Sequence, residues 1–241
     1  MNDLTPEMGG AACPIFRNRG RRGVVLCDGP APSRELVEYW LQGAEIFICT
    51  DAAGHPYTHL PCAPDVVIGD FDSLTGRILD GRDGPRYLQV SDQHTTDGEK
   101  ALLYLVDQGY TEAVLLGATG WYLDHTLFNV HLLERFADRL DICLAGHKAD
   151  SVRLGPGTQV SWDLNPGTRF SVLPLAGEAK NVTVEGADYP ILAETLVPGG
   201  RATIGNRVGQ SPLLIAVGEG SLIVSVDREP VYDDDFDSGQ E

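Results

Sequence analysis

The chain has 241 residues, 42% of them hydrophobic and 22% charged, and carries a formal net charge of -17 at pH 7. Its length suffices for one large domain or two modest ones, and its composition is typical of globular proteins. Because binding to a phosphate backbone normally needs a basic surface, the negative charge argues against a nucleic-acid partner.

The cysteines and the apolar stretches indicate where the protein works. No stretch is long and apolar enough to cross a bilayer, and the N-terminal residues lack the apolar core of a signal peptide. The five cysteines are odd in number and lack CxxC spacing. Cys27, Cys49 and Cys143 lie in apolar runs, where a free thiol packs as a small hydrophobe. We therefore expect a cytoplasmic protein with no membrane partner.

Up to about Asp150, short apolar runs alternate with segments of helical character. The apolar runs predict strands over residues 24–27, 46–50, 66–68, 87–90, 113–116 and 142–145. The segments between them predict helices over residues 33–42, 96–108 and 124–139. Strands that alternate with helices are typical of a largely parallel, covered sheet. The pattern therefore predicts an α/β N-terminal domain.

After Asp150 the helical pattern disappears. Short runs separated by Gly, Pro or Asn turns predict strands over residues 152–154, 159–163, 169–173, 181–185, 202–204, 213–217 and 222–226. Frequent short strands with such turns indicate an all-β sandwich or barrel. We predict a flexible N-terminus over residues 1–20, the α/β domain over 21–148, the all-β domain over 149–228 and an acidic tail over 229–241.

Residues 65–74, DVVIGDFDSL, carry the strongest chemical signal. Asp70 and Asp72 follow a buried strand at a spacing of two residues, so in extended chain both carboxylates face one side. They lie at the C-terminal end of a strand, where open α/β sheets bind ligands. Two adjacent carboxylates favour a divalent cation, and oxygen ligands suit Mg²⁺. The alternative is a pair of solvated loop aspartates.

Residues 91–100, SDQHTTDGEK, lead from a strand into a helix. Thr96 with Glu99 three residues later is a capping-box pattern. It places Asp97 in the first helical turn and Asp92 in the loop before it. Asp97 then either joins the two aspartates of the preceding motif or only complements the helix dipole.

Residues 117–129, GATGWYLDHTLFN, form a glycine-rich turn between a strand and a helix. Such turns can bind phosphate through backbone N–H groups. His125 shares a helix face with Asn129, and a capping pair is the alternative interpretation. Asp28 and Asp51 end the first two predicted strands, as turn residues or as functional carboxylates. In a parallel sheet, all these side chains lie along one rim.

Together these segments resemble thiamine pyrophosphokinase over about residues 24–226. The matching motifs are GDFDSL at 69–74, DQHTTD at 92–97, GATG at 117–120, DHTLFN at 124–129, GN at 205–206, SPLL at 211–214 and GEGSLIV at 218–224. The resemblance implies a nucleotide-binding catalytic α/β domain, a thiamine-binding β-sandwich, a homodimer with shared active sites, and Mg²⁺ as cofactor. It also implies transfer of a diphosphoryl group from ATP to the hydroxyl of thiamine, which gives thiamine diphosphate and AMP.

The resemblance further implies roles for single residues. Asp70, Asp72 and Asp97 match the metal-binding and catalytic carboxylates of the family. Nucleotide binding is implied for Asp51, Gly117, Thr119, Gly120, His125 and Asn129. Substrate binding is implied for Gln93, Thr96, Asp124 and Asn206.

The sequence departs from the family pattern at two informative places. Trp121 and Tyr122 stand where the family commonly has Gly-Arg, so a guanidinium available to phosphate is absent. The candidates to replace it are Arg77, Arg82, Arg86, Lys100 and Arg207. Ile215 stands where many relatives have an aromatic residue, so stacking on the acceptor passes to Trp121, Tyr122 or Trp162. A diphosphokinase for a pterin-like alcohol and a noncatalytic nucleotide-sensing protein therefore remain as alternatives.

Overall fold

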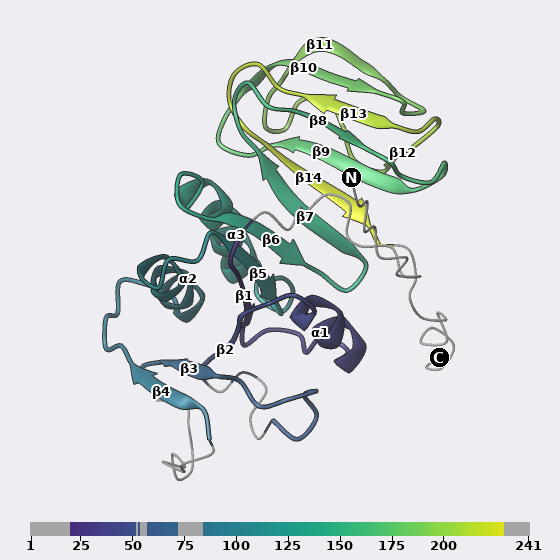
Figure 1. The fold of residues 1–241 in the computed structure, drawn as a ribbon. Helices are drawn as coiled ribbons and strands as arrows, with labels where there is room; N and C mark the ends of the chain where they lie inside the picture. The colour runs from purple at the N-terminus through teal and green to yellow at the C-terminus, as the bar shows by residue number, and fades with distance from the viewer. Residues whose placement is uncertain (1–19, 52, 54–56, 72–83, 229–241) are drawn as a thin grey trace, which may run out of the picture.

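The fold is built on two β-sheets, one of which runs through the whole molecule (Figure 1). The computed structural model describes residues 20–51, 53, 57–71 and 84–228. Within these residues, a ten-stranded sheet has the order β12-β9-β14-β7-β6-β5-β1-β2-β3-β4, and a four-stranded sheet has the order β11-β10-β13-β8. No helix in this part of the chain is long and apolar enough to span a membrane.

Six strands form the parallel part of the long sheet. They are β1 (Arg22–Leu26), β2 (Ile46–Thr50), β3 (Val66–Gly69), β4 (Arg86–Gln89), β5 (Glu112–Leu116) and β6 (Asp141–Ala145). Every neighbouring pair among them is parallel. β1, β3 and β5 are buried at every residue, whereas β4, at the edge, is partly exposed. This agrees with the predicted covered, largely parallel sheet.

Helices cover both faces of the parallel strands. α1 (Arg34–Leu41) packs on one face, and α2 (Asp97–Asp107) and α3 (Leu123–Arg135) pack on the other. Successive strand residues alternate between the two cores: Val24 packs on the α1 side and Val25 on the α2 side. α3 ends at Arg135, four residues before the predicted end. The buried Phe136 caps it, and tight turns then carry the chain into β6.

The C-terminal strands form a sandwich in which one layer is continuous with the α/β sheet. β7 (Ala149–Leu154), β14 (Leu222–Asp227), β9 (Arg169–Pro174) and β12 (Asn206–Arg207) extend the long sheet in antiparallel pairing. The second layer consists of β8 (Gln159–Trp162), β13 (Leu213–Ala216), β10 (Ala179–Glu185) and β11 (Ile191–Leu196). β7, β13 and β14 alternate buried and half-buried residues, as expected for strands with one core face.

Two details of the sandwich differ from prediction. The predicted strand over residues 202–204 is irregular: Thr203 accepts a backbone bond from Val172 N–H (3.0 Å), and regular pairing begins only at β12. β11 is a strand that the sequence pattern does not reveal. It pairs with β10 through register shifts, has a left-handed Ala193 (φ 52°) and exposes Leu192, so its residues do not alternate.

The two parts of the molecule meet at an antiparallel hairpin. β6 and β7 pair through Cys143 with Val152 and Ala145 with Asp150, around a turn at residues 146–148. The apolar core on the α1 side of the sheet is also continuous with the sandwich interior. The predicted change of character near residue 150 therefore falls within one uninterrupted sheet.

Candidate active site

The loops that follow the parallel strands surround one cavity of about 510 Å³. It lies at the carboxyl ends of β1, β2, β3 and β5. Around β1 the chain order reverses, because β2 lies on one side and β5 on the other. Such switch points are where open α/β sheets bind ligands. The cavity is lined by six carboxylates, those of Asp28, Asp51, Asp70, Asp92, Asp97 and Asp124.

Two loops of the cavity pack backbone against backbone. A Cβ atom on Gly29 would lie 2.0 Å from the carbonyl oxygen of Gly117, and one on Gly117 would lie 2.7 Å from that of Cys27. Gly117 also has φ 63°, in the left-handed region. Glycine is therefore required here, and the glycine-rich turn is held directly against the end of β1.

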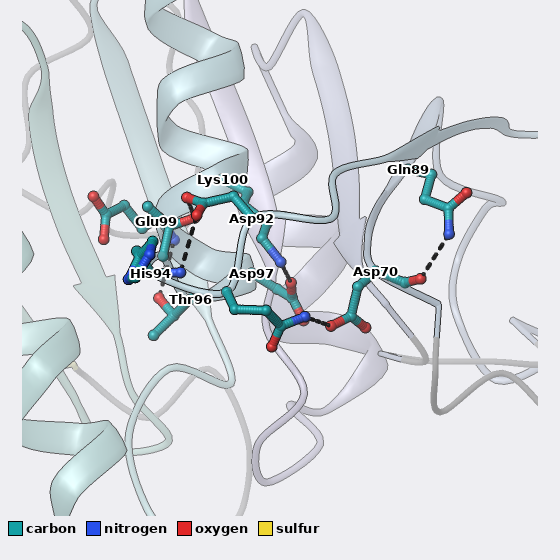
Figure 2. Close-up of polar contacts among 10 residues, drawn as sticks. Asp70, Gln89, Asp92, His94, Thr96, Asp97, Glu99 and Lys100 are labelled. Atoms are coloured by element: carbon teal, nitrogen blue, oxygen red, sulfur yellow. Dashed lines mark hydrogen bonds and ion pairs between the residues drawn. The ribbon is translucent and has the colours of Figure 1, made fainter.

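Asp70 is anchored at the end of β3 by two glutamine side chains. Gln93 Nε2 donates to Asp70 Oδ2 (3.1 Å), and Gln89 Nε2 donates to the Asp70 carbonyl oxygen (3.0 Å). Figure 2 shows that Asp70, from the loop after β3, and Asp97, from the first turn of α2, lie toward the same region. The hydrogen bond between Gln93 and Asp70 joins the loop after β3 to the loop that precedes α2.

Asp92 shapes the loop before α2. Its carboxylate accepts from His94 N–H (3.0 Å) and from Thr95 Oγ1 (2.8 Å). The backbone hydrogen bond from His94, followed by the one from Thr95, lowers the pKa of Asp92. This loop therefore keeps a negative charge at the cavity rim.

The first turn of α2 contributes a charged pair of which the lysine is buried and the aspartate half-buried. Thr96 is the N-cap and its Oγ1 accepts from Glu99 N–H (3.3 Å), as the capping pattern predicts. The Glu99 carboxylate, however, pairs with Arg135 of α3 (2.6 Å). Lys100 Nζ lies 2.8 Å from Asp97 Oδ1 (Figure 2). Asp97 is therefore fixed by a lysine of its own helix.

The turn between β5 and α3 is held by two side chains of α3. Asn129 Nδ2 donates to the carbonyl oxygen of Ala118 (2.7 Å). Thr126 Oγ1 accepts from Gly120 N–H (3.0 Å) and donates to the carbonyl oxygen of Tyr122 (3.0 Å). Tyr122, the N-cap residue, makes no side-chain capping bond. His125 and Asn129 are therefore not a capping pair, and Asn129 supports the glycine-rich turn instead.

Most residues predicted for the site line this cavity. Those that do are Asp51, Asp70, Gln93, Thr96, Asp97, Gly117, Gly120, Asp124, His125 and Asn129. Thr119 belongs to the glycine-rich turn but is half-buried and outside the lining. Asn206 lies in β12, where its amide bonds both the N–H and the carbonyl of Tyr189. Asp72 lies outside the described residues.

Sequence reasoning missed several lining residues, namely Cys27, Thr50, Thr95, Gly98 and Phe128. Thr95, Gly98 and Phe128 lie within the motifs at residues 91–100 and 124–129, and Cys27 and Thr50 lie at strand ends, but the pattern assigns none of them a role. Cys27 is instructive, since burial raises the pKa of its thiol to about 12. A thiol that stays protonated is a poor nucleophile, so the cavity does not favour cysteine chemistry.

Three non-glycine residues adopt left-handed backbone around the cavity. Asp51 has φ 40° and Trp121 φ 38°, and both line it; Phe71, with φ 64°, directly follows Asp70. Such conformations cost about 1–3 kcal/mol each and cluster at functional sites. The strain therefore coincides with the surface that the carboxylates line.

The donor set suits a hard cation. The cavity offers carboxylate oxygens from Asp70 and Asp97, and such ligands fit Mg²⁺ better than a soft transition metal. Within residues 20–51, 53, 57–71 and 84–228, no three His, Cys, Asp or Glu side chains converge on one point. The third predicted ligand, Asp72, is outside these residues.

Comparison with known proteins shows what this part of the chain is similar to. Residues 37–144 match the family model described as thiamin pyrophosphokinase, catalytic domain. This range includes most of the residues that line the cavity. This region is therefore similar to the catalytic domain of thiamin pyrophosphokinases. Comparison with curated protein sequences gives no match.

Solved thiamin pyrophosphokinases share the fold of the chain. The Bacillus subtilis enzyme has 21% identity, a TM-score of 0.73, and coverage of 87% of this chain and 100% of that one. The Geobacillus thermodenitrificans enzyme has 25% identity, a TM-score of 0.71, and coverage of 87% and 99%. The yeast enzyme has 16% identity, a TM-score of 0.75, and coverage of 88% of each chain. The similarity thus extends over both the catalytic domain and the β-sandwich.

Proposed function

We propose that the chain transfers the diphosphoryl group of ATP to the hydroxyl of thiamine and releases AMP. The observation that carries the proposal is the carboxylate-lined cavity with its glycine-rich turn, which lies within the matched catalytic domain. The cavity combines two features that this chemistry needs: oxygen ligands for a cation and backbone N–H groups for phosphate.

The proposed transfer needs positioning more than covalent chemistry. The hydroxyl oxygen forms a bond to the β-phosphorus while the bond from that phosphorus to the oxygen of the α-phosphate breaks, and the electron pair leaves with AMP. The hydroxyl proton passes to a base. The backbone of residues 117–120 holds phosphate oxygens, apart from the Gly120 N–H, which donates to Thr126 Oγ1. Asp97 orients the hydroxyl and is our candidate for the base.

Asp70, Asp72 and Asp97 are the proposed holders of Mg²⁺. The positions of Asp70 and Asp97 on one cavity support this assignment. Mg²⁺ bound there neutralises charge on the phosphates and on the departing AMP. The protein contributes the fixed direction of its carboxylates, through Gln93 for Asp70 and through Lys100 for Asp97.

Among the aromatic candidates, we assign stacking on the acceptor ring to Trp121 and Tyr122. Both line the cavity and are exposed, at 70% and 66%. Trp162 and Ile215 are buried in the sandwich core. The rings of Trp121 and Tyr122 are thus available to a heteroaromatic acceptor, and the Thr126 hydroxyl fixes the turn that carries them.

We also propose a homodimer in which active sites are shared. Apolar side chains are exposed in two places: at the cavity mouth and on the sandwich, where Tyr189, Leu192 and Ile204 are 71%, 66% and 62% exposed. Contact between these surfaces of two copies would bury both groups. Asn206, which holds Tyr189, would then act at the site of the second copy.

A cytoplasmic location follows as a proposal from the thiols. In the part of the chain that the structure describes, Cys27, Cys49, Cys62 and Cys143 are free. This agrees with the expected reduced cysteines.

The direct test is to incubate the purified protein with Mg²⁺ and ATP plus one alcohol at a time, and to measure AMP. Thiamine is expected to elicit AMP and thiamine diphosphate, and a hydroxymethyl pterin is not. AMP release with the pterin alone would transfer the assignment to another diphosphokinase. Nucleotide binding without AMP release from any alcohol would favour a sensing role.

A further inference from the structure

One lysine lines the cavity together with its six carboxylates. Within residues 20–51, 53, 57–71 and 84–228, Lys100 is the only lysine or arginine in the lining. The proposed substrate carries a triphosphate, which six carboxylates repel. A fixed cation inside the cavity is therefore valuable for nucleotide binding.

The other basic side chains considered from sequence do not reach this position. Arg86 is the first residue of β4, so it lies at the edge of the sheet opposite the carboxyl ends. Arg207 lies in β12, and its guanidinium donates to the carbonyl oxygen of Gly167 (2.9 Å). Arg77 and Arg82 are outside the described residues.

The Lys100 side chain is only 4% exposed, yet its ammonium group is incompletely bonded by protein. An ammonium has three N–H donors. Within the described part of the chain, its one hydrogen-bond partner is Asp97 Oδ1, at 2.8 Å. Since burying unpaired donors is costly, the remaining N–H groups call for acceptors inside the cavity.

The location of Lys100 also fits a phosphate contact. It lies in the first turn of α2, where a Cβ atom on Gly98 would be 3.7 Å from Asn129 Oδ1. Asn129 in turn holds the carbonyl of Ala118 in the glycine-rich turn. The start of α2 and the predicted phosphate-binding turn thus face the same part of the cavity.

We propose that Lys100 binds oxygens of the transferred diphosphoryl group and takes the place of the guanidinium that Trp121 and Tyr122 leave absent. The inference rests on the proposed function, because it presupposes a nucleoside triphosphate in the cavity. Lys100 then does two things: its ammonium fixes Asp97 and donates to phosphate oxygens. No proton moves and no covalent bond forms at the lysine.

The test compares two nucleotides that differ only in the phosphates beyond the first. Calorimetry measures binding of α,β-methylene-ATP and of AMP, each with Mg²⁺, to the wild type, Lys100→Met, Lys100→Gln and Lys148→Met. Lys148 is exposed and outside the cavity, so its variant controls for the lost charge. Both Lys100 variants are expected to bind the triphosphate analogue about 10-fold more weakly or worse, and AMP within about 2-fold of wild type.

Lys100→Gln separates a phosphate contact from a purely structural role. Its amide can still donate to Asp97 but has no charge, and thermal unfolding checks that each variant is folded. Wild-type affinity of this variant for the analogue, or equal weakening for both nucleotides, overturns the inference. If the wild type turns over thiamine while the Lys100 variants bind the analogue normally, only the inference fails. If the wild type binds no nucleotide, the proposed function fails with it.

Discussion

The carboxylates of the cavity are held by neighbours that differ in chemistry. Asp70 is bonded by an amide, Asp97 by an ammonium, and Asp92 by a backbone N–H and a hydroxyl. These partners all donate to carboxylate oxygens, so they hold the carboxylates in fixed directions. The carboxylate oxygens are thus already held in position before a substrate binds.

Removing one carboxylate charge should therefore affect turnover much more than stability. Asp70→Asn and Asp97→Asn keep the side-chain size and are expected to lower kcat about 100-fold or more, with the melting temperature changed by only a few degrees. We expect the same of Asp72→Asn. Steady-state AMP formation and thermal unfolding measure the two effects.

The matched control is Asp163→Asn, because Asp163 is exposed and lies outside the cavity. Its turnover should stay at the wild-type level. Wild-type turnover of a folded Asp97→Asn protein would remove Asp97 from the proposed machinery.

Single residues of the site were predictable where a motif fixes their spacing. Asp70 and Asp97 follow from two short motifs at strand and helix ends, and Asn129 from helical spacing. Thr50 and Phe128 stand next to predicted site residues, but their residue types carry no chemical signal, so only the structure shows that they line the cavity. The preference for Lys100 over Arg86 and Arg207 likewise depends on burial and on where each one lies in the sheet.

Two adjacent residues of α3 connect this helix to two different elements, α2 and β7. Arg135 pairs with the fully buried Glu99 of α2 (2.6 Å). Glu134 makes two hydrogen bonds to Arg153 of β7 (2.6 and 3.1 Å). The last turn of α3 is thus tied to the helix that carries Asp97 on one side and to the sandwich on the other.

The Glu99–Arg135 pair should stabilise the contact between the helices. Arg135→Met leaves a buried carboxylate without its cation and is expected to cost about 2 kcal/mol of unfolding free energy. The double variant Glu99→Gln with Arg135→Met also removes the buried charge, so it should be no less stable than Arg135→Met alone. Chemical denaturation of the wild type, Glu99→Gln, Arg135→Met and the double variant measures these differences. Strictly additive losses would show that the two residues do not interact.

The Glu134–Arg153 pair should make stability depend on pH in the acid range. The hydrogen bond from Arg153 lowers the pKa of Glu134 below its ordinary value of 4.5. A carboxyl whose pKa is lower in the folded state stabilises the fold above its ordinary pKa. That contribution is lost as the pH falls through the folded value.

Glu134→Gln should therefore be less stable than wild type at pH 7, and the difference should shrink as the pH falls below about 4.5. Thermal unfolding at a series of pH values measures the trend. A difference that grows toward acid pH would have the wrong sign for this pair.

At the scale of elements, patterns with a strong period gave good predictions. β2 has its predicted bounds, and α1 and α2 end within a residue or two of theirs, because their caps and apolar spacing are local. β11 escaped prediction because a left-handed Ala193 and register shifts remove its alternation. Such irregularity is set by the neighbouring strand and not by the segment itself.

The two halves of the molecule are joined by the ten-stranded sheet and by the apolar core on the α1 side of that sheet. β6 pairs with β7, and the core that covers α1 includes residues of the sandwich, among them Trp162 and Phe170. The sequence predicts two successive domains, since composition changes near residue 150. It does not reveal the shared sheet, because pairing of β6 with β7 depends on how the chain reverses at residues 146–148.

This continuity predicts a single unfolding transition. In the described part of the chain, all helices belong to the α/β half, so circular dichroism at 222 nm reports on that half. Trp40→Phe with Trp121→Phe leaves Trp162 as the only tryptophan, and its fluorescence reports on the sandwich. The two denaturation curves should coincide. Clearly separate midpoints would show that the halves unfold independently.

The left-handed backbone at Trp121 implies a trade-off between thermal stability and the aromatic ring that this residue brings to the cavity. Glycine would relieve the positive φ at this position and should raise the melting temperature. The same exchange would delete an aromatic ring from the mouth of the cavity. Selection for a higher melting temperature alone would thus favour a more stable protein that, under the proposed function, binds its acceptor more weakly.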